Sequence, residues 1–334
     1  MKKEILLPFE DDCYTLSYQC SAFPIGIIQA NAQNDILPWL ASKYINCSYH
    51  RGNIFDICVT DKWFCLDEKL IFQCVNLTKD LYIDQSVDIV ELLRMMIDLR
   101  CYPNGMYNEE YICGKTNYKK SYFSHDYLLI GYNDEKRVFY SVGYLADGKF
   151  QRFSIPYDSM KQALETLKGT NIIFYFLKYN SDAQYTFHTD VFLQELFDYI
   201  NSTTSVKVFR TDTYFGMQAI CEMAKDLLIN AEEKHRIDKR YLRALMEHKF
   251  LMVKRIEYLN NECGLTLSNI KEYAIQIHKM AETVHLLGIK YSITREFSIA
   301  NRIVELIDKM LILEAEHLPL LYDRVKNAQE DGVL

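Results

Sequence analysis

Cysteine and histidine residues in the first part of this chain could together catalyse acyl transfer. A cysteine nucleophile needs a thiolate, a histidine within hydrogen-bond reach and usually a third group that orients the imidazole. Cys20 lies just ahead of a predicted helix, where the helix dipole and exposed backbone N–H groups favour a thiolate. His125 lies at the start of a predicted strand that leads into a hairpin. Cys20 and His125 are therefore the candidate catalytic pair.

This order of residues is by itself a weak signal, because 10 cysteines and 8 histidines offer many accidental pairs. The ordinary alternative for Cys20 is a small apolar residue buried in the core. For His125 the alternative is a histidine at the edge of a sheet that bonds to solvent. A second cysteine, Cys13, is the runner-up for the nucleophile.

The elements that must position this pair fall in residues 1–185, where helical and strand patterns mix. The clearest is a hairpin over His125–Tyr144, in which two runs rich in Tyr, Val, Leu and Ile flank a turn-prone Asn-Asp pair. Further strands are expected from Glu109 onwards and at Asn171–Leu177. Helices are expected directly after Cys20 with Pro24 in the first turn, at Asp35–Tyr44, at Ser86–Arg100 with Ser86 as N-cap, and at Tyr157–Leu167.

Residues 186–334 are predicted to form a helical domain, since apolar residues recur there at helical spacing. Gly288 is expected to end one helix in the left-handed conformation, and Pro319 to kink or end the last one. The predicted helices are Asp190–Ile200, Tyr214–Asn230, His235–Asn261, Ser268–Leu287 and Thr294–Asn327.

The run HDYLLIGYNDEKRVFYSVGYLADGKF resembles the histidine-bearing hairpin of the papain-fold acyltransferases of antibiotic biosynthesis. These are relatives of the butirosin-pathway enzyme that moves an acyl group from a carrier protein to an aminoglycoside amine. Their N-terminal signature, a Cys followed at once by a short apolar helix, is matched by YQCSAFPIGII. The family is similar to the C39 bacteriocin-leader peptidases, and comparable cysteine-protease homologues accompany thiotemplated (polythioamide) pathways. The resemblance covers the chain in outline, and its specific part is the hairpin.

The resemblance implies an α+β, papain-like cysteine-protease fold, with N-terminal helices plus an antiparallel sheet. Residues 1–185 would form this catalytic domain, and residues 186–334 a C-terminal all-α helical domain that covers the cleft. Cys20 would be the nucleophile and His125 the base. The implied partners are an acyl or peptidyl carrier protein, which presents the substrate on a phosphopantetheine arm, and a small amine acceptor. No resident cofactor or metal is implied.

The chain departs from the family pattern at the third catalytic residue. If the hairpin turn centres on residues 134 and 135, His125 faces Tyr144 and Tyr127 faces Val142. The family's Asp or Asn would then lie near residues 141–144, where the sequence SVGY has neither. The candidate orienters of the imidazole are the hydroxyls of Ser141 and Tyr144, a backbone carbonyl, and Asp147.

The chain also departs from the family at the oxyanion donor. Papain-like enzymes carry a Gln six residues before the Cys, and that position is Tyr14 here. Gln19, directly beside Cys20, is the candidate donor instead, together with the backbone N–H of Cys20.

The composition indicates which partners and which cellular location are compatible with this chemistry. The net charge of −7 and the lack of a Lys/Arg run disfavour nucleic acid and anionic membranes as partners. No apolar run approaches the ~20 residues of a membrane span. The start lacks the apolar stretch of a signal peptide, so a cytoplasmic location with reduced thiols is expected. Cys47 and His50 with Cys58 and Cys65 do not match the spacing of a common zinc finger, and no metal site is predicted.

The sequence therefore predicts an acyl or peptidyl transferase that forms an amide bond from a carrier-protein thioester through a thioester on Cys20. Two alternatives stay open. The first is a cysteine peptidase or thioesterase, in which water or a peptide replaces the amine. The second is a papain-like shell that binds a carrier protein or a small amine without chemistry.

Overall fold

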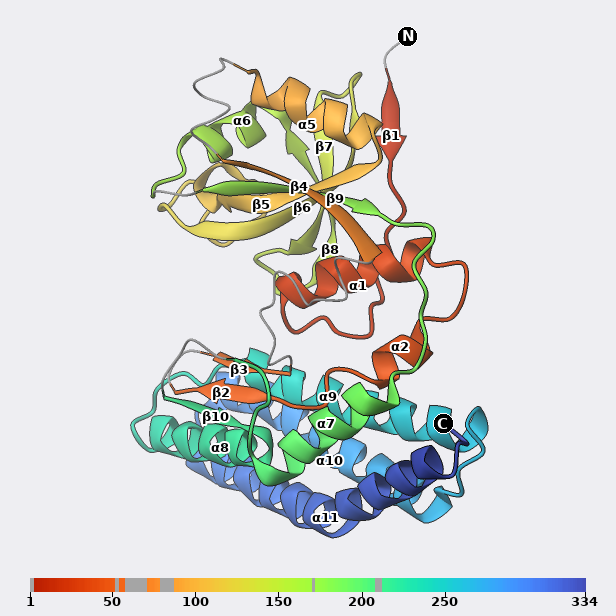
Figure 1. The fold of residues 1–334 in the computed structure, drawn as a ribbon. Helices are drawn as coiled ribbons and strands as arrows, with labels where there is room; N and C mark the ends of the chain where they lie inside the picture. Colours follow the sequence, from red (N-terminus) through yellow and green to blue (C-terminus); the bar gives the residue numbers. More distant parts are fainter. Residues whose placement is uncertain (1–2, 52–53, 58–70, 79–86, 170–171, 208–211) are drawn as a thin grey trace. The chain divides into compact units, whose positions relative to one another are not determined.

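The computed structural model describes residues 3–51, 54–57, 71–78, 87–169, 172–207 and 212–334 (Figure 1). The chain is of the α+β class, with antiparallel sheets and a helical C-terminal region, which confirms the expected class. It divides into two compact units. The first combines residues 1–33 and 63–184, and the second combines residues 34–62 and 185–334. The main border thus lies next to the expected one, but the segment 34–62 belongs to the helical unit.

The strands described in the first unit form one antiparallel sheet in the order β4-β9-β5-β6-β7-β8, with β1 beside β6. The N-terminal half of β6 pairs with β5 and its C-terminal end pairs with β1, while its other edge pairs with β7. β6 is therefore the central strand. The bounds are β1 (Glu4–Leu6), β4 (Phe72–Thr78), β5 (Cys101–Asn108), β6 (Ser124–Asn133), β7 (Val138–Tyr144), β8 (Phe150–Pro156) and β9 (Ile173–Tyr179).

Helices cover both faces of this sheet: α5 (Ile89–Asp98) and α6 (Tyr157–Glu165) lie on one face, and α1 (Gln19–Asn31) lies on the other (Figure 1). Because both faces are covered, the middle of β6 reads as a continuous apolar run rather than an alternating one. Three successive residues there, Leu128, Leu129 and Ile130, are fully buried.

The predicted hairpin is confirmed, but its predicted register is wrong. Val142 faces Leu128 rather than Tyr127, and the ladder is irregular between Leu129 and Gly131. The turn holds four residues, because Asn133 pairs with Val138 and its side chain accepts a hydrogen bond from the Lys136 amide (2.9 Å). A shift of one residue moves each side chain to the opposite face of a strand. The expected pairing of His125 with Tyr144 is therefore lost.

Local details of the first unit also differ from the prediction. Pro24 lies inside α1 rather than in its first turn. The N-cap of α5 is Asp88, whose carboxylate accepts from the amides of Val90 (2.8 Å) and Glu91 (3.4 Å), and the predicted cap Ser86 lies outside the described residues. Strand β5 was not predicted, because Pro, Asn and Gly are poor strand formers. Of the region expected to be rich in strands from Glu109 onwards, the first residues form a 3₁₀ turn, η1 (Glu109–Tyr111), and the strands begin with β6.

The second unit packs long helices side by side, with α10 between α9 and α11 (Figure 1). The predicted helix end at Gly288 is wrong: α10 runs on to Thr294, and Arg295 takes the left-handed conformation. Gly288 packs there against α9, since a Cβ would lie 2.4 Å from Leu242 Cδ1. Pro319 lies inside α11 and does not end it. The elements are α2 (Leu37–Ala41), β2 (Ser48–His50), β3 (Ile54–Asp56), α7 (Thr189–Asn201), β10 (Thr213–Phe215), α8 (Gly216–Glu232), α9 (Lys239–Asn261), α10 (Ser268–Thr294) and α11 (Phe297–Glu330).

Buried polar groups of α7 and α9 hold the segment 41–46 in the helical unit. Arg255 is fully buried and donates to the Ala41 carbonyl (Nε, 2.8 Å) and to the Lys43 carbonyl. The Nε2 atom of His248 lies 2.7 Å from the Ile45 carbonyl. The Glu195 carboxylate accepts from the amide of Ile45 (2.8 Å) and from that of Asn46 (3.3 Å). These bonds satisfy backbone groups that burial would otherwise leave without water.

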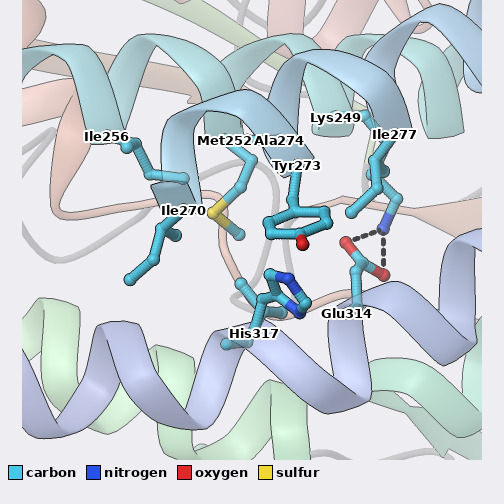
Figure 2. A pocket seen from close by; sticks show the side chains of 10 residues that line it. Lys249, Met252, Ile256, Ile270, Tyr273, Ala274, Ile277, Glu314 and His317 are labelled. Carbon is cyan, nitrogen blue, oxygen red and sulfur yellow. Dashed lines mark hydrogen bonds and ion pairs between the residues drawn. The ribbon is translucent and has the colours of Figure 1, made fainter. Parts of the chain in front are cut away.

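A second buried group, an ion pair, joins α9 to α11. The Nζ atom of Lys249 lies 2.7 and 2.8 Å from the two carboxylate oxygens of Glu314, and both side chains are 1% exposed (Figure 2). The Tyr199 hydroxyl accepts from Lys249 and donates to Glu314, each at 2.7 Å. The pair is therefore fully hydrogen bonded inside the bundle, as a buried pair must be.

No helix in the described part of the chain is both long and apolar enough to cross a membrane.

The buried pair gives a stability prediction. Replacing Lys249 by Met leaves the Glu314 charge buried without its cation, so the helical unit should lose about 3–5 kcal/mol. The double variant with Glu314→Leu should recover most of that loss, because neither charge remains. Urea unfolding measures the free energy of unfolding of the single and the double variant. Hydrogen exchange in peptides of α9 and α11 shows whether the loss lies in the helical unit.

The matched control is Lys254→Met on the same helix. Lys254 pairs with Glu257 at 3.2 Å near the surface, and such a pair contributes about 1 kcal/mol or less. Equal losses from Lys249→Met and Lys254→Met would contradict the buried role of Lys249.

Candidate active site

The side chain of Gln19 joins the first turn of α1 to the sheet. Its Nε2 atom donates to the backbone carbonyl (3.1 Å) and to Oδ1 (2.9 Å) of Asp126, and its Oε1 atom accepts from the Tyr144 amide (2.7 Å). The β6–β7 ladder ends at Leu128 with Val142, and two residues further out it would pair Asp126 with Tyr144. The Gln19 amide thus stands where the two strands would otherwise bond to each other.

This bond brings together the chain positions that sequence analysis singled out. Cys20 follows Gln19 in the first turn of α1, and His125 precedes Asp126 on β6. A side-chain contact therefore connects the immediate neighbours of the two candidate catalytic residues. Cys20 and His125 are partly exposed, so reagents can reach this end of the sheet.

Gly143 makes room for the Gln19 amide. A Cβ at Gly143 would lie 2.5 Å from Gln19 Oε1, and the backbone φ of +153° is one that side-chain-bearing residues rarely adopt. Any larger residue at position 143 would displace the Gln19 side chain from the strand end.

Glu109 orients the imidazole of His125. Its Oε1 atom lies 3.0 Å from His125 Nδ1, and its Oε2 atom accepts from Asn117 Nδ2 at 3.0 Å. Tyr107 on β5 faces His125 on β6, so the residues after β5 turn back beside the histidine. With Nδ1–H donating to Glu109, Nε2 is the nitrogen that can accept a proton from a thiol.

Burial and hydrogen bonding act in opposite directions on the Glu109 carboxyl. Burial raises its pKa, but the hydrogen bonds from His125 and Asn117, together with the electrostatic effects of His125 and Lys115, outweigh this effect. The pKa of Glu109 is therefore held below its ordinary value. Glu109 stays ionised, which is the state that can hold the imidazole in one tautomer and support its protonation.

A second carboxylate lies at the other ring nitrogen. Asp126 Oδ1 is 3.3 Å from His125 Nε2, while it also accepts from Gln19. The imidazole thus stands between Glu109 and Asp126. For Nε2 to take a proton from Cys20, the ring or the Asp126 side chain must move slightly.

The sequence-predicted orienters make other contacts. Ser141 is fully buried and its hydroxyl donates to the Leu128 carbonyl (2.8 Å), while the Tyr144 hydroxyl donates to the Leu16 carbonyl. Asp147 accepts from the Lys149 amide at 3.0 Å. The expectation that Ser141 or Tyr144 orients His125 is therefore corrected to Glu109. The one-residue register shift explains the error for the two hairpin residues.

The expected role of Gln19 also changes. Its amide nitrogen is committed to Asp126, so it is placed to position α1 rather than to bind an oxyanion. Cys13, the alternative nucleophile, is buried, and its thiol donates to the Glu10 carbonyl (2.9 Å) and to the Ala22 carbonyl (3.6 Å). Because Cys13 is buried and in contact with backbone carbonyls, it is less accessible to a substrate than the partly exposed Cys20.

Glu109 was missed because strand β5 was missed. With β5 unassigned, nothing placed residues 109–111 beside His125. The available signal was an acidic pair, Glu109-Glu110, after Asn108, whose side chain accepts from the Glu110 amide (3.2 Å) as a cap does.

Among the described residues, no three His, Cys, Asp or Glu side chains are grouped so that they could hold a metal ion. Cys47 is fully buried, donates to the Gly216 carbonyl (3.3 Å), and has a pKa that burial raises to about 12. Of the other residues considered as zinc ligands, His50 ends strand β2, while Cys58 and Cys65 lie outside the described residues.

A hollow between α9, α10 and α11 is too small for a substrate. Lys249 and Glu314 lie at one end and Ile256 and Ile270 at the other, with Tyr273 and His317 between them (Figure 2). Its free volume of about 10 Å³ admits about one water molecule. This hollow is therefore not a candidate substrate site.

Comparison with protein-family models found no match, and comparison with curated proteins found none either.

The fit between Gly143 and Gln19 can be tested by substitution. Gly143→Ala should destabilise the first unit by about 1–3 kcal/mol, because the new methyl group collides with the Gln19 amide. Gly148→Ala is the matched control: Gly148 has a left-handed φ of +76°, but a Cβ added there would meet no atom within 4 Å. Hydrogen exchange in peptides of β6 and β7 should show the larger loss for Gly143→Ala. Equal losses would argue against the Gln19 contact.

The lowered pKa of Glu109 predicts a pH dependence of stability. Glu109 binds fewer protons in the folded state than in the unfolded state between its lowered pKa and its ordinary value of 4.5. Its contribution is complete above pH 4.5 and is lost as the pH falls through the folded-state pKa. Unfolding measured from pH 6 to pH 3 should therefore be less steeply pH-dependent in Glu109→Gln than in the unmodified protein. Identical slopes would contradict the ion pair.

Proposed function

We propose that this protein is an acyl or peptidyl transferase of papain-like fold that forms an amide bond through a thioester on Cys20. The acyl group would come from a thioester on the phosphopantetheine arm of a carrier protein, and the acceptor would be a small amine. No resident cofactor or metal takes part.

In the first step, Nε2 of His125 accepts the proton of the Cys20 thiol, and the thiolate attacks the thioester carbonyl. The carbon–sulfur bond of the donor breaks, and the departing phosphopantetheine thiolate takes the proton from His125. In the second step, the amine attacks the Cys20 thioester and His125 accepts its proton. The amide is released, and the proton returns to the Cys20 sulfur.

The observation that carries this proposal is the Gln19 contact. Gln19 is bonded to Asp126, and Cys20 follows Gln19 along the chain while His125 precedes Asp126, so this contact joins the immediate neighbours of the two catalytic candidates. The Glu109 carboxylate on His125 Nδ1 supplies the third member of a cysteine–histidine–carboxylate set. The N-terminal turn of α1 adds a dipole and backbone N–H groups that favour a thiolate and a developing oxyanion.

The arrangement of elements supports the papain-like part of the proposal. A helix carries Cys20 in its first turn and packs against an antiparallel sheet, and the central strand of that sheet carries His125. The carboxylate of Glu109 reaches the imidazole from η1, which directly follows strand β5, rather than from β7, the position expected for the family.

Mass spectrometry tests the proposal directly. Incubation with an acyl thioester of phosphopantetheine should add one acyl mass to Cys20, and a subsequent primary amine should remove it as an amide. Cys20→Ser should show no thioester adduct, and His125→Ala should slow its formation by about 10²–10⁴-fold, the usual contribution of a general base. Cys13→Ser is the control and should react like the unmodified protein.

Other results would reassign the activity. Release of free acid instead of amide would indicate a thioesterase or peptidase. An adduct on Cys13 alone would remove Cys20 from the mechanism.

A non-catalytic binding protein is the second candidate, and one observation favours it. Asp126 lies 3.3 Å from His125 Nε2, the nitrogen that catalysis requires. With that nitrogen held by a carboxylate, the imidazole would not activate a thiol, and the domain would act only by binding. Absence of any acyl adduct, together with binding of the carrier protein in a calorimetric titration, would support this alternative.

A further inference from the structure

Lys115 is a cation buried beside the candidate site, with no role in the mechanism described so far. The residue is 5% exposed, although lysine is almost never buried unless it is paired. Its Nζ atom donates to the Tyr144 carbonyl at 2.6 Å and lies 5.7 Å from the ring centroid of Tyr107 and 5.0 Å from that of Phe153. The ammonium is therefore enclosed by β5, β7 and β8.

Lys115 and Gln19 hold the same residue from two sides. The Tyr144 amide donates to Gln19 Oε1, and the Tyr144 carbonyl accepts from Lys115. Gly143 brings the two holding groups close together, since its missing Cβ would lie 2.5 Å from Gln19 Oε1 and 3.6 Å from Lys115 Nζ. Beyond the end of the β6–β7 ladder, side chains thus fix the main chain of Tyr144.

The charges that act on Lys115 come from both carboxylates around His125. Burial is the largest effect on Lys115, and it lowers the pKa of the ammonium to about 8 against the opposing charges of Glu109 on η1 and Asp126 on β6. The Tyr107 phenol on β5 is neutral, because burial and the same two carboxylates raise its pKa well above the ordinary value. Lys115 is thus the lysine whose charge compensates two carboxylates placed at one imidazole.

We propose that Lys115 is a positioning residue of the candidate site: its ammonium fixes the Tyr144 carbonyl opposite Gln19 and balances the Glu109 and Asp126 charges on either side of His125. Because Gln19 precedes Cys20, this hold extends to the helix turn that carries the nucleophile. The inference rests on the proposed function for its catalytic meaning, while the electrostatic and positional claims can be measured without any substrate.

Nuclear magnetic resonance tests the electrostatic claim. In protein labelled at the Glu109 carboxyl carbon, Lys115→Met should move the Glu109 titration to higher pH, because removal of a nearby cation disfavours the carboxylate. Lys115→Arg keeps the charge and should leave the titration close to that of the unmodified protein. Lys119→Met, at an exposed lysine of the same loop, is the control and should have no effect.

The claim that Lys115 holds the Tyr144 main chain is tested first in the unmodified protein. In the unmodified protein, the resonances of the Tyr144 amide and the Gln19 side-chain amide should shift together with a midpoint near pH 8 as Lys115 loses its proton. Lys115→Arg should remove this transition, since a guanidinium stays charged. The proposal would be overturned if the Glu109 titration were the same in Lys115→Met as in the unmodified protein. It would also be overturned if the amide resonances of Gln19 and Tyr144 did not change when Lys115 loses its proton.

The effect of Lys115 on the acylation of Cys20 is measured in a separate experiment. Acylation of Cys20 by a phosphopantetheine thioester at pH 6 should fall about tenfold in Lys115→Met, because the Tyr144 carbonyl loses the hydrogen bond that holds this strand end, and should recover in Lys115→Arg. If the unmodified protein forms no adduct, the transferase proposal fails while the titrations still decide the role of Lys115. If the adduct forms equally well in Lys115→Met, Lys115 is not a positioning residue for catalysis.

Discussion

The side-chain amide of Gln19 is the contact on which the candidate site depends. It lies where strands β6 and β7 stop pairing and bonds to Asp126 on one side and to Tyr144 on the other. A side-chain amide can replace a backbone pair because it carries the same donor and acceptor groups. Since Gln19 is the first residue of α1, this replacement fixes the helix turn that holds Cys20 to the strand that holds His125.

Around this contact, a small buried region collects several charges. Glu109 and Asp126 lie at the two nitrogens of His125, and the charges of both carboxylates act on the pKa of Lys115. Charges interact strongly in such surroundings because little water screens them, so each group depends on the others for its protonation state. Gly143 contributes to the same region sterically, because the lack of a side chain there leaves the space that the Gln19 amide occupies.

The buried charges of the helical unit have a different consequence. Lys249 and Glu314 satisfy each other and Tyr199 between helices, and Arg255 bonds to backbone carbonyls of the segment 41–46. These contacts join elements that are far apart in the sequence and leave no reactive group exposed.

The sequence by itself determined the α+β class, the His125–Tyr144 hairpin and the long C-terminal helices, because apolar periodicity and turn residues are local properties of the chain. It also selected Cys20 and His125 as positions worth testing. Only the tertiary structure decided the hairpin register: the four-residue turn and the irregularity at Leu129–Gly131 together leave it one residue away from the predicted pairing. The structure likewise decided that Glu109, rather than Ser141 or Tyr144, orients the imidazole, that Gln19 holds α1, and that residues 34–62 join the helical unit. Each of these depends on contacts between distant segments, and local residue patterns carry no information about which distant backbone lies alongside.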